Sequence, residues 1–270
     1  MISRDSPPRP PKASETPGSF SLAFGRAWIS DSDTLEPEDL AERSDRARLV
    51  PVVRAGQIGR FSHTREPVTR WAEPERAEAV SKGTLPFFRL AVRRVSSARN
   101  ARTLVATVLP PGIATGPSVY TSAEPASMFR MLTVCALLNS YVCDWEMRRI
   151  ANTTINACSL HQLHIPEPAG KVRRALYEAA LRRLIVQPGF AGPMDLVGFG
   201  APDRAAGTRA ACFDAWMQAA AAMAFGLDRG DLLTVLAGFD IGDVERDAIL
   251  FKYDQGEGYW FETLHTYSAG

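Results

Sequence analysis

The chain has 270 residues, of which 46% are hydrophobic, so it is long enough for one large globular domain or two small ones. Its formal net charge of +1 does not by itself indicate a nucleic-acid partner, but an acidic tail from residue 240 onward masks a basic middle. With no apolar signal sequence and no run of membrane-spanning length, the sequence predicts a cytoplasmic protein without a membrane partner. The four cysteines form no Cys-x-x-Cys pair, and we interpret them as reduced, mostly buried thiols.

The N-terminal part reads as an arm followed by short strands. Residues 1–18 are rich in proline, which predicts a disordered or extended arm. Residues 19–29 alternate weakly between apolar and polar side chains and predict a strand. Residues 49–61 predict a second strand, a bend at glycine and a further apolar run.

A basic stretch with one aromatic side chain follows, over residues 60–76. It contains Arg65, Arg70 and Trp71. Basic side chains interleaved with an aromatic ring are typical of a surface that contacts the DNA backbone. A surface loop anchored by its tryptophan explains the same residues, and the sequence leaves both interpretations open.

Two strands are predicted in the middle of the chain. Leu90 and Val92 alternate with Arg89 and Arg93, which predicts a half-buried strand with one polar face. Residues 103–109 are β-branched and apolar at successive positions, which predicts a buried strand that ends at the following Pro-Pro-Gly.

Between Lys82 and Glu124 the chain carries basic residues but no acidic ones. The basic residues are Lys82, Arg89, Arg93, Arg94, Arg99 and Arg102. Because crowded like charges repel each other, this cluster suggests an anionic partner. The alternative, a solvated strand face and turn, stays open at this stage.

From residue 128 to residue 145, apolar residues recur every three or four positions, which predicts one long amphipathic helix. Thr121 and Glu124 have capping-box spacing and predict its start. Two further basic side chains, Arg148 and Arg149, follow the apolar stripe.

Polar residues interrupt this helix and precede the next segment. Asn139 and Ser140 are poor helix formers, so we expect them to have a packing or contact role. Residues 159–168 predict a short strand that prolines end. On a strand His161 and His164 would face opposite sides, so the spacing argues against a shared metal ion.

The C-terminal third predicts helices. An apolar stripe runs through residues 172–184, and residues 208–225 form an alanine-rich run suited to tight helix packing, with Gly226 as a C-terminal cap. Asp228 predicts the start of a shorter helix that Gly238 ends.

Taken in order, these segments resemble the target-recognition region of N6-adenine-specific DNA methyltransferases from type I and fused type II restriction-modification systems. The resemblance includes an arginine-bearing strand, an Asn-x-Arg-Thr turn, a strand ending in Pro-Pro-Gly, a helix with Leu-Asn-Ser and a short Leu-Pro-x-Pro strand. Glycine and apolar positions upstream also match. The matching residues are Asn100, Arg102, Thr103, Asn139, Ser140, Gly25, Arg26, Gly56, Ile58 and Phe61. The chain departs from the family pattern at Arg94, where Asp is usual, and at His164, where Pro is usual.

The resemblance implies an α+β fold. It places a β-rich target-recognition domain with a long helix at residues 19–169 and a helical support region at residues 170–270. It also implies that the chain recognises duplex DNA sequence-specifically, as part of phage defence. The candidate DNA-binding residues are Arg65, Arg70, Arg89, Arg93, Arg94, Arg99, Asn100, Arg102, Arg148 and Arg149.

These candidates divide by whether they match the shared motif, since family members read different sequences. Arg93, Asn100 and Arg102 match it, so they fit fold-holding or phosphate contacts better than base reading. Base readers are expected where the sequence is idiosyncratic. These places are residues 60–76, Arg94, Arg99 and residues 113–120.

The catalytic signature of this family is missing from the sequence. Adenine methylation needs Asn/Asp-Pro-Pro-Tyr/Phe to hold the flipped base, and Pro110-Pro111 follows a leucine and precedes a glycine. No glycine-rich fingerprint for a methyl donor is present either. We therefore expect no catalytic, metal or cofactor site in this chain. Catalysis would be supplied by another chain or a missing domain, with a methyltransferase and/or nuclease as the partner chain and S-adenosylmethionine bound by the catalytic partner. A non-catalytic protein adaptor, a truncated remnant without DNA binding and an enzyme with an unrecognised site remain alternatives.

Overall fold

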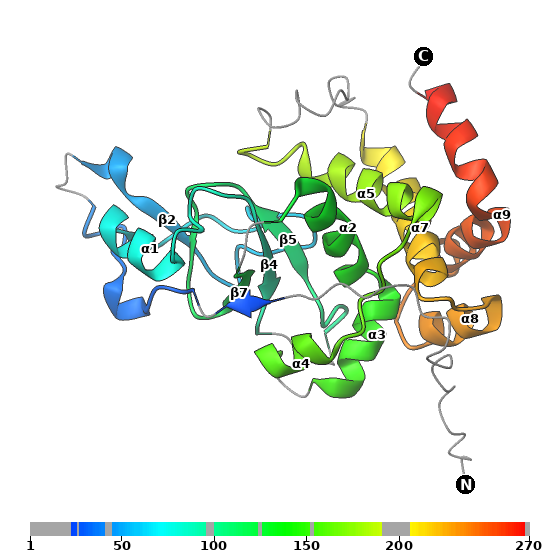
Figure 1. Cartoon of the computed structure of the whole chain (residues 1–270), viewed down its shortest axis with the longest axis horizontal. Coiled ribbons are helices and arrows are strands. Elements are labelled where there is room, and N and C mark those ends of the chain that lie inside the picture. The colour runs from blue at the N-terminus through cyan, green and yellow to red at the C-terminus, as the bar shows by residue number, and fades with distance from the viewer. Residues whose placement is uncertain are drawn as a thin grey trace, which may run out of the picture.

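The computed structural model describes residues 23–25, 27–40, 45–95, 100–123, 126–151, 154–190 and 206–267. It confirms a mixed α+β fold whose C-terminal part is helical. Figure 1 shows the strands in one part of an elongated molecule and the C-terminal helices at the other end. The expected arm at residues 1–18 lies outside the described residues.

Two sheets make up the β part. The larger has the order β1-β7-β4-β5 with antiparallel neighbours, and comprises Phe24–Gly25, Val119–Ser122, Arg89–Arg93 and Ala106–Leu109. The smaller has the order β3-β2-β6, and comprises Trp71–Ala72, Val50–Val53 and Ala114–Thr115. Here β2 is antiparallel to β3 and parallel to β6. Three short helices flank β2 and β3 in the sequence. Helices η1 (Asp31–Asp33) and η2 (Arg46–Arg48) precede β2, and α1 (Pro74–Ser81) follows β3.

The prediction of a half-buried strand at β4 is wrong, because both faces of β4 are covered. Leu90 and Val92 pack into the main core cluster together with residues of α2. On the other face Ala91 packs against Val53 and Ile58, which come from β2 and the turn after it. The alternation suggested an exposed face because Arg89 is polar, but the Arg89 side chain is buried as well.

The single helix predicted over residues 128–145 is wrong, because the chain forms two helices. Helix α2 spans Met128–Leu138 and α3 spans Tyr141–Ile150. Asn139 ends the first helix, and Ser140 begins the second by accepting a hydrogen bond from the Cys143 amide at 3.1 Å. The apolar spacing continues across the break, since the chain re-enters a helix after two residues.

The predicted start of that helix is also wrong. The N-cap of α2 is Ser127, whose hydroxyl accepts a hydrogen bond from the Arg130 amide at 3.2 Å. Thr121 belongs to strand β7 instead, and Glu124 lies outside the described residues.

The strand predicted over residues 159–168 begins in a helix instead. Helix α4 spans Ala157–Gln162, and Asn156 caps it by accepting a hydrogen bond from the Ser159 amide at 2.7 Å. The polar cap decides the local structure here, although the apolar alternation that follows is typical of a strand. His161 Nε2 accepts the amide of Phe24 at 3.5 Å, so α4 is tied to the start of β1.

Three C-terminal helices agree with their expected positions. They are α5 (Gly170–Leu184), α7 (Ala206–Ala224) and α8 (Arg229–Ala237), and α9 (Asp243–Tyr267) follows them. Gly226, with φ +67°, ends α7 as the amide of Leu227 reaches the carbonyl of Ala222 at 3.0 Å. Asp228 caps α8 through the Asp231 amide. The acidic tail forms α9, which kinks at Gly256 and which the sequence analysis did not foresee.

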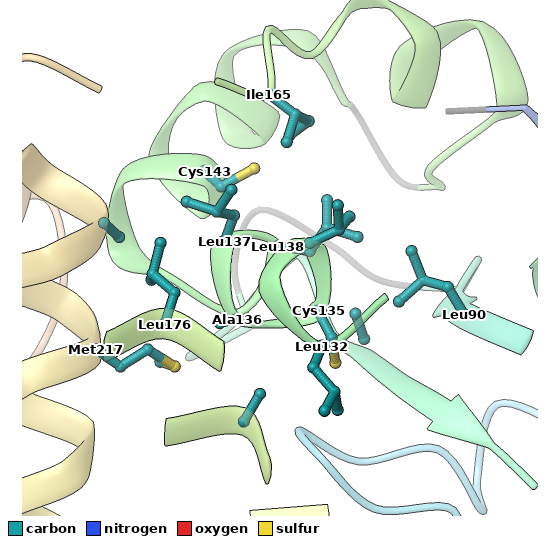
Figure 2. Close-up of a cluster of buried hydrophobic side chains, with 14 of the residues drawn as sticks. Leu90, Leu132, Cys135, Ala136, Leu137, Leu138, Cys143, Ile165, Leu176 and Met217 are labelled. Atoms are coloured by element: carbon teal, nitrogen blue, oxygen red, sulfur yellow. The ribbon is translucent and has the colours of Figure 1, made fainter. Parts of the chain in front are cut away.

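The main hydrophobic cluster joins the sheet to the helices. Figure 2 shows Leu90 of β4, Leu132 and Leu138 of α2, and Leu176 of α5 gathered with Met217 of α7. Alanines of α7 are buried against this cluster, as expected for tight helix packing. The cluster extends from β1 to α7 and so crosses the predicted boundary at residue 169.

The cysteines described in the structure are unpaired. Cys135 and Cys143 are buried, whereas Cys158 is exposed. Burial raises the pKa of both Cys135 and Cys143, which keeps them as thiols. The side chain of Cys212 lies outside the described part.

Candidate nucleic-acid interface

Arg89 is a structural residue on β4, a central strand of the larger sheet. It is only 1% exposed, and its Nη2 donates a hydrogen bond to the carbonyl of Ile113. Burial lowers the pKa of Arg89 to about 10, with Glu78 acting in the opposite direction. A side chain placed in this way fixes the segment that follows the Pro-Pro-Gly turn and does not reach the surface.

Arg102 is also turned inward, against α3. Its Nε lies 2.7 Å from Oδ2 of Asp144, and its Nη2 donates to the carbonyl of Asn139 at 2.5 Å. Its guanidinium carbon lies 4.2 Å from the ring centre of Tyr141. Asp144 in turn accepts the amides of Thr103 and Leu104, at 3.0 and 3.2 Å. The matched Asn-x-Arg-Thr turn is thus anchored by one buried carboxylate.

Asn139 acts as a bridge between α2 and β5. Its Oδ1 accepts the amide of Ala106 at 3.1 Å, and its Nδ2 donates to the carbonyl of the same residue at 2.8 Å. The side chain therefore pairs with β5 as a neighbouring strand would. This is the packing role expected for Asn139 and Ser140.

Arg148 braces the turn that contains Asn100. Its Nη2 donates to the carbonyls of Asn100 and Ala101 at 2.8 and 2.9 Å, and its Nη1 donates to Gly238 at 3.1 Å. The guanidinium also lies 4.1 Å from the ring centre of Phe239. Arg148 therefore links the turn to the end of α8.

The basic stretch at residues 60–76 is partly neutralised by acids from earlier in the chain. Arg70 lies 2.5 Å from Glu36, and Arg76 lies 2.6 Å from Asp33. Trp71 belongs to β3, so it anchors the stretch to the smaller sheet. The sequence analysis missed the acidic partners Asp33, Glu36 and Asp144. All three lie outside residues 82–123, the stretch without acidic residues.

Four of the candidate arginines remain at the surface without an ion pair to any described carboxylate. They are Arg65, Arg93, Arg94 and Arg149. Arg94 donates to the carbonyl of Pro117 at 3.2 Å, and Arg93 to that of Val95 at 2.8 Å. Arg149 lies over the ring of Trp145, 4.8 Å from its centre. Arg99 lies outside the described residues.

The structure brings the idiosyncratic segments together beside Arg94. The amide of Gly116 donates to the carbonyl of Val53, and the amide of Ala55 donates to Oγ of Ser118, both at 2.9 Å. The amide of Arg94 donates to the carbonyl of Ser118, also at 2.9 Å. Residues 113–120 therefore lie between β2 and the basic end of β4. Arg54, which the sequence analysis did not single out, directly follows β2 and packs against Gly116.

A hollow opens where two of these segments meet. It has a volume of about 320 Å³ and is lined by Pro51, Val53, His63, Thr64, Glu66, Pro67, Val68 and Ile113. Burial lowers the pKa of His63, so its imidazole is neutral at physiological pH. This hollow could not be predicted from the sequence, because the residues that line it come from strands and loops that are far apart in the sequence.

The described residues contain no group of three or more His, Cys, Asp or Glu side chains that could hold a metal ion. Within the same part of the chain, every helix is too short or too polar to cross a membrane. Guanidinium groups that lie at the surface without a carboxylate partner can attract an anionic polymer.

No protein-family model matches the chain, and no curated protein matches it. A solved structure of the type IIL restriction-modification enzyme MmeI in complex with DNA is similar, with a TM-score of 0.51 at 14% sequence identity. The similarity covers 89% of this chain and 36% of the MmeI chain, so this chain spans about a third of that enzyme's length. The fold of this chain is therefore similar to that of part of a restriction-modification enzyme.

Proposed function

We propose that this chain is a sequence-specific duplex-DNA recognition module of a restriction-modification system, of the adenine-specific methyltransferase type. The observation that supports this most is the similarity over 89% of the chain to an enzyme solved with DNA. The partly exposed Arg93 and Arg94, at the end of β4 and beside residues 113–120, supply positive charge that such a module needs. Catalysis, with its S-adenosylmethionine, would come from a partner methyltransferase or nuclease.

In this proposal some arginines are structural and others contact DNA. Arg89, Arg102 and Arg148 hold the scaffold through carbonyl and carboxylate partners. Arg93 and Arg94 face solvent at the end of β4 and contact DNA, with Arg94 as the base reader. An arginine that binds guanine with two hydrogen bonds contributes about 1–3 kcal/mol of discrimination.

The test is duplex-DNA affinity across a salt series, followed by selection of the preferred sequence. For the parent chain we expect the logarithm of the binding constant to fall linearly with the logarithm of salt, by about 0.9 per neutralised phosphate. Arg93→Ala should weaken binding to all sequences and flatten this slope, since it removes a phosphate contact. Arg94→Ala, and Arg99→Ala likewise, should weaken binding most for the selected sequence.

Arg229→Ala is the matched control. Arg229 is exposed and paired with Asp254 in the helical end of the molecule, away from β4 in Figure 1. Its loss should leave DNA affinity unchanged. A parent chain that does not bind duplex DNA even at low salt would refute the proposal and favour the protein adaptor.

A further inference from the structure

The residues that line the hollow beside β2 suit the binding of one flat, partly apolar group. Proline and aliphatic side chains form most of its wall, namely Pro51, Val53, Pro67, Val68 and Ile113. Such a wall offers flat contact area but no hydrogen bonds, so it suits the faces of a heterocyclic ring. A phosphate in the hollow would lose its hydration against these groups without compensation.

The polar groups of the hollow are few and lie on one segment. Thr64 and Glu66 bring a hydroxyl and a carboxylate, and His63 brings a neutral imidazole. His63 is 4% exposed, and its Nδ1 has no hydrogen-bonding partner among the described residues. Thr64 and Glu66 are exposed and could pair with the N–H and ring-nitrogen edge of a base, and the Glu66 carboxylate repels an anion.

The carboxylate of Glu66 lies beside the turn after β2. It packs over Gly56, one of the positions that carry the family resemblance. Because Glu66 is exposed and flexible, its carboxylate can move aside, so this contact does not by itself require glycine.

Two arginines neighbour lining residues of the hollow in the sequence. Arg65 is exposed between Thr64 and Glu66, and Arg54 follows Val53 directly. Arg54 is held by an exposed ion pair with Asp31 at 3.2 Å, which costs little to exchange for a phosphate. A phosphate at the rim and a ring inside are the two parts of one nucleotide.

We infer that this hollow takes up one unstacked base of the bound duplex, with Arg65 on a flanking phosphate. This inference rests on the proposed function and adds to it a binding site for one nucleotide. Taking a base out of the stack costs a few kcal/mol, which contacts inside a fitted pocket offset. The module would thus distort the duplex at a fixed position as it reads the sequence.

The experiment uses the full chain and the duplex selected for tightest binding. Each adenine in turn is replaced by 2-aminopurine, whose fluorescence rises when the base leaves the stack. We expect a rise of several-fold at one position on binding. Val68→Trp and Thr64→Trp fill the hollow from a partly buried and an exposed position, and both should abolish the rise while the duplex stays bound.

Val244→Trp is the matched control, since Val244 is 87% exposed on α9 at the far end of the molecule. This variant should keep both the affinity and the fluorescence rise. A parent that binds the duplex without any rise overturns the inference and leaves the proposed function intact, as does a rise that persists in both filled variants. A parent that binds no duplex at any salt overturns the proposed function, and the inference with it.

Discussion

The arginines of this chain are distinguished by their partners rather than by their number. Arg89 and Arg102 are buried against backbone carbonyls, and Arg102 also faces a carboxylate. Arg65 and Arg94 lie at the surface near the hollow and residues 113–120. Buried guanidinium groups stabilise the scaffold, whereas exposed ones are available to an anionic partner.

Glu146 on α3 gives a pH-dependent prediction. Burial raises its pKa to about 7, although Arg149 opposes the shift. Because the folded state prefers the protonated carboxyl, the charged form destabilises the fold above pH 7, and this penalty vanishes as the pH falls toward the unfolded pKa. Glu146→Gln should therefore raise the free energy of unfolding at pH 8, on the order of 1–3 kcal/mol, and by little near pH 4.5.

Urea unfolding at several pH values measures this difference. Glu75→Gln, at an exposed position on α1, removes the same charge without burial and serves as the control. If the gain from Glu146→Gln were equal at pH 8 and pH 4.5, its cause would be side-chain packing and not ionisation.

At the scale of elements, one carboxylate connects the turn before β5 to helix α3. Asp144 accepts the amides of Thr103 and Leu104 and pairs with Arg102, and its side chain is fully buried. Removing one member of a buried ion pair leaves the other charge unpaired, which costs about 3–5 kcal/mol. Asp144→Asn should lower the free energy of unfolding by this amount, as measured by urea denaturation.

Asp31→Asn is the comparison, because Asp31 forms an exposed ion pair with Arg54. Exposed pairs contribute about 0–1 kcal/mol, so this variant should be nearly as stable as the parent. Equal losses in the two variants would mean that Asp144 contributes no more than a surface pair, against the geometry described above.

For the whole molecule, the core predicts a single unfolding transition. The main cluster includes Leu90 of β4, Leu176 of α5 and Met217 of α7, so residues 19–169 and 170–270 share their largest hydrophobic surface. Neither part can lose its partner without exposing that surface to water. Urea unfolding followed by far-ultraviolet circular dichroism and by tryptophan fluorescence should give coincident curves. Two separate transitions would support the predicted boundary at residue 169 as a boundary between independent folding units.

Helices α5, α7 and α8 and several strands were predictable from sequence, because their apolar spacing and caps act locally. Asp228 and Gly238 bound α8 as expected, and Gly226 ends α7. The errors occurred where short-range patterns were ambiguous. Asn139 and Ser140 end one helix and begin another within the same apolar spacing, and Asn156 starts a helix where alternation favours a strand.

The sequence by itself determined the class of the fold, its helical C-terminal part and the excess of arginine in its middle, since local propensity and composition carry this information. Only the tertiary structure decided which arginines are available. Asp144 lies more than forty positions from the turn it anchors, and residues 113–120 meet the segment after β2 through sheet pairing. Charge neutralisation and pocket walls depend on distances in space, and these become defined when the two sheets and the helices pack.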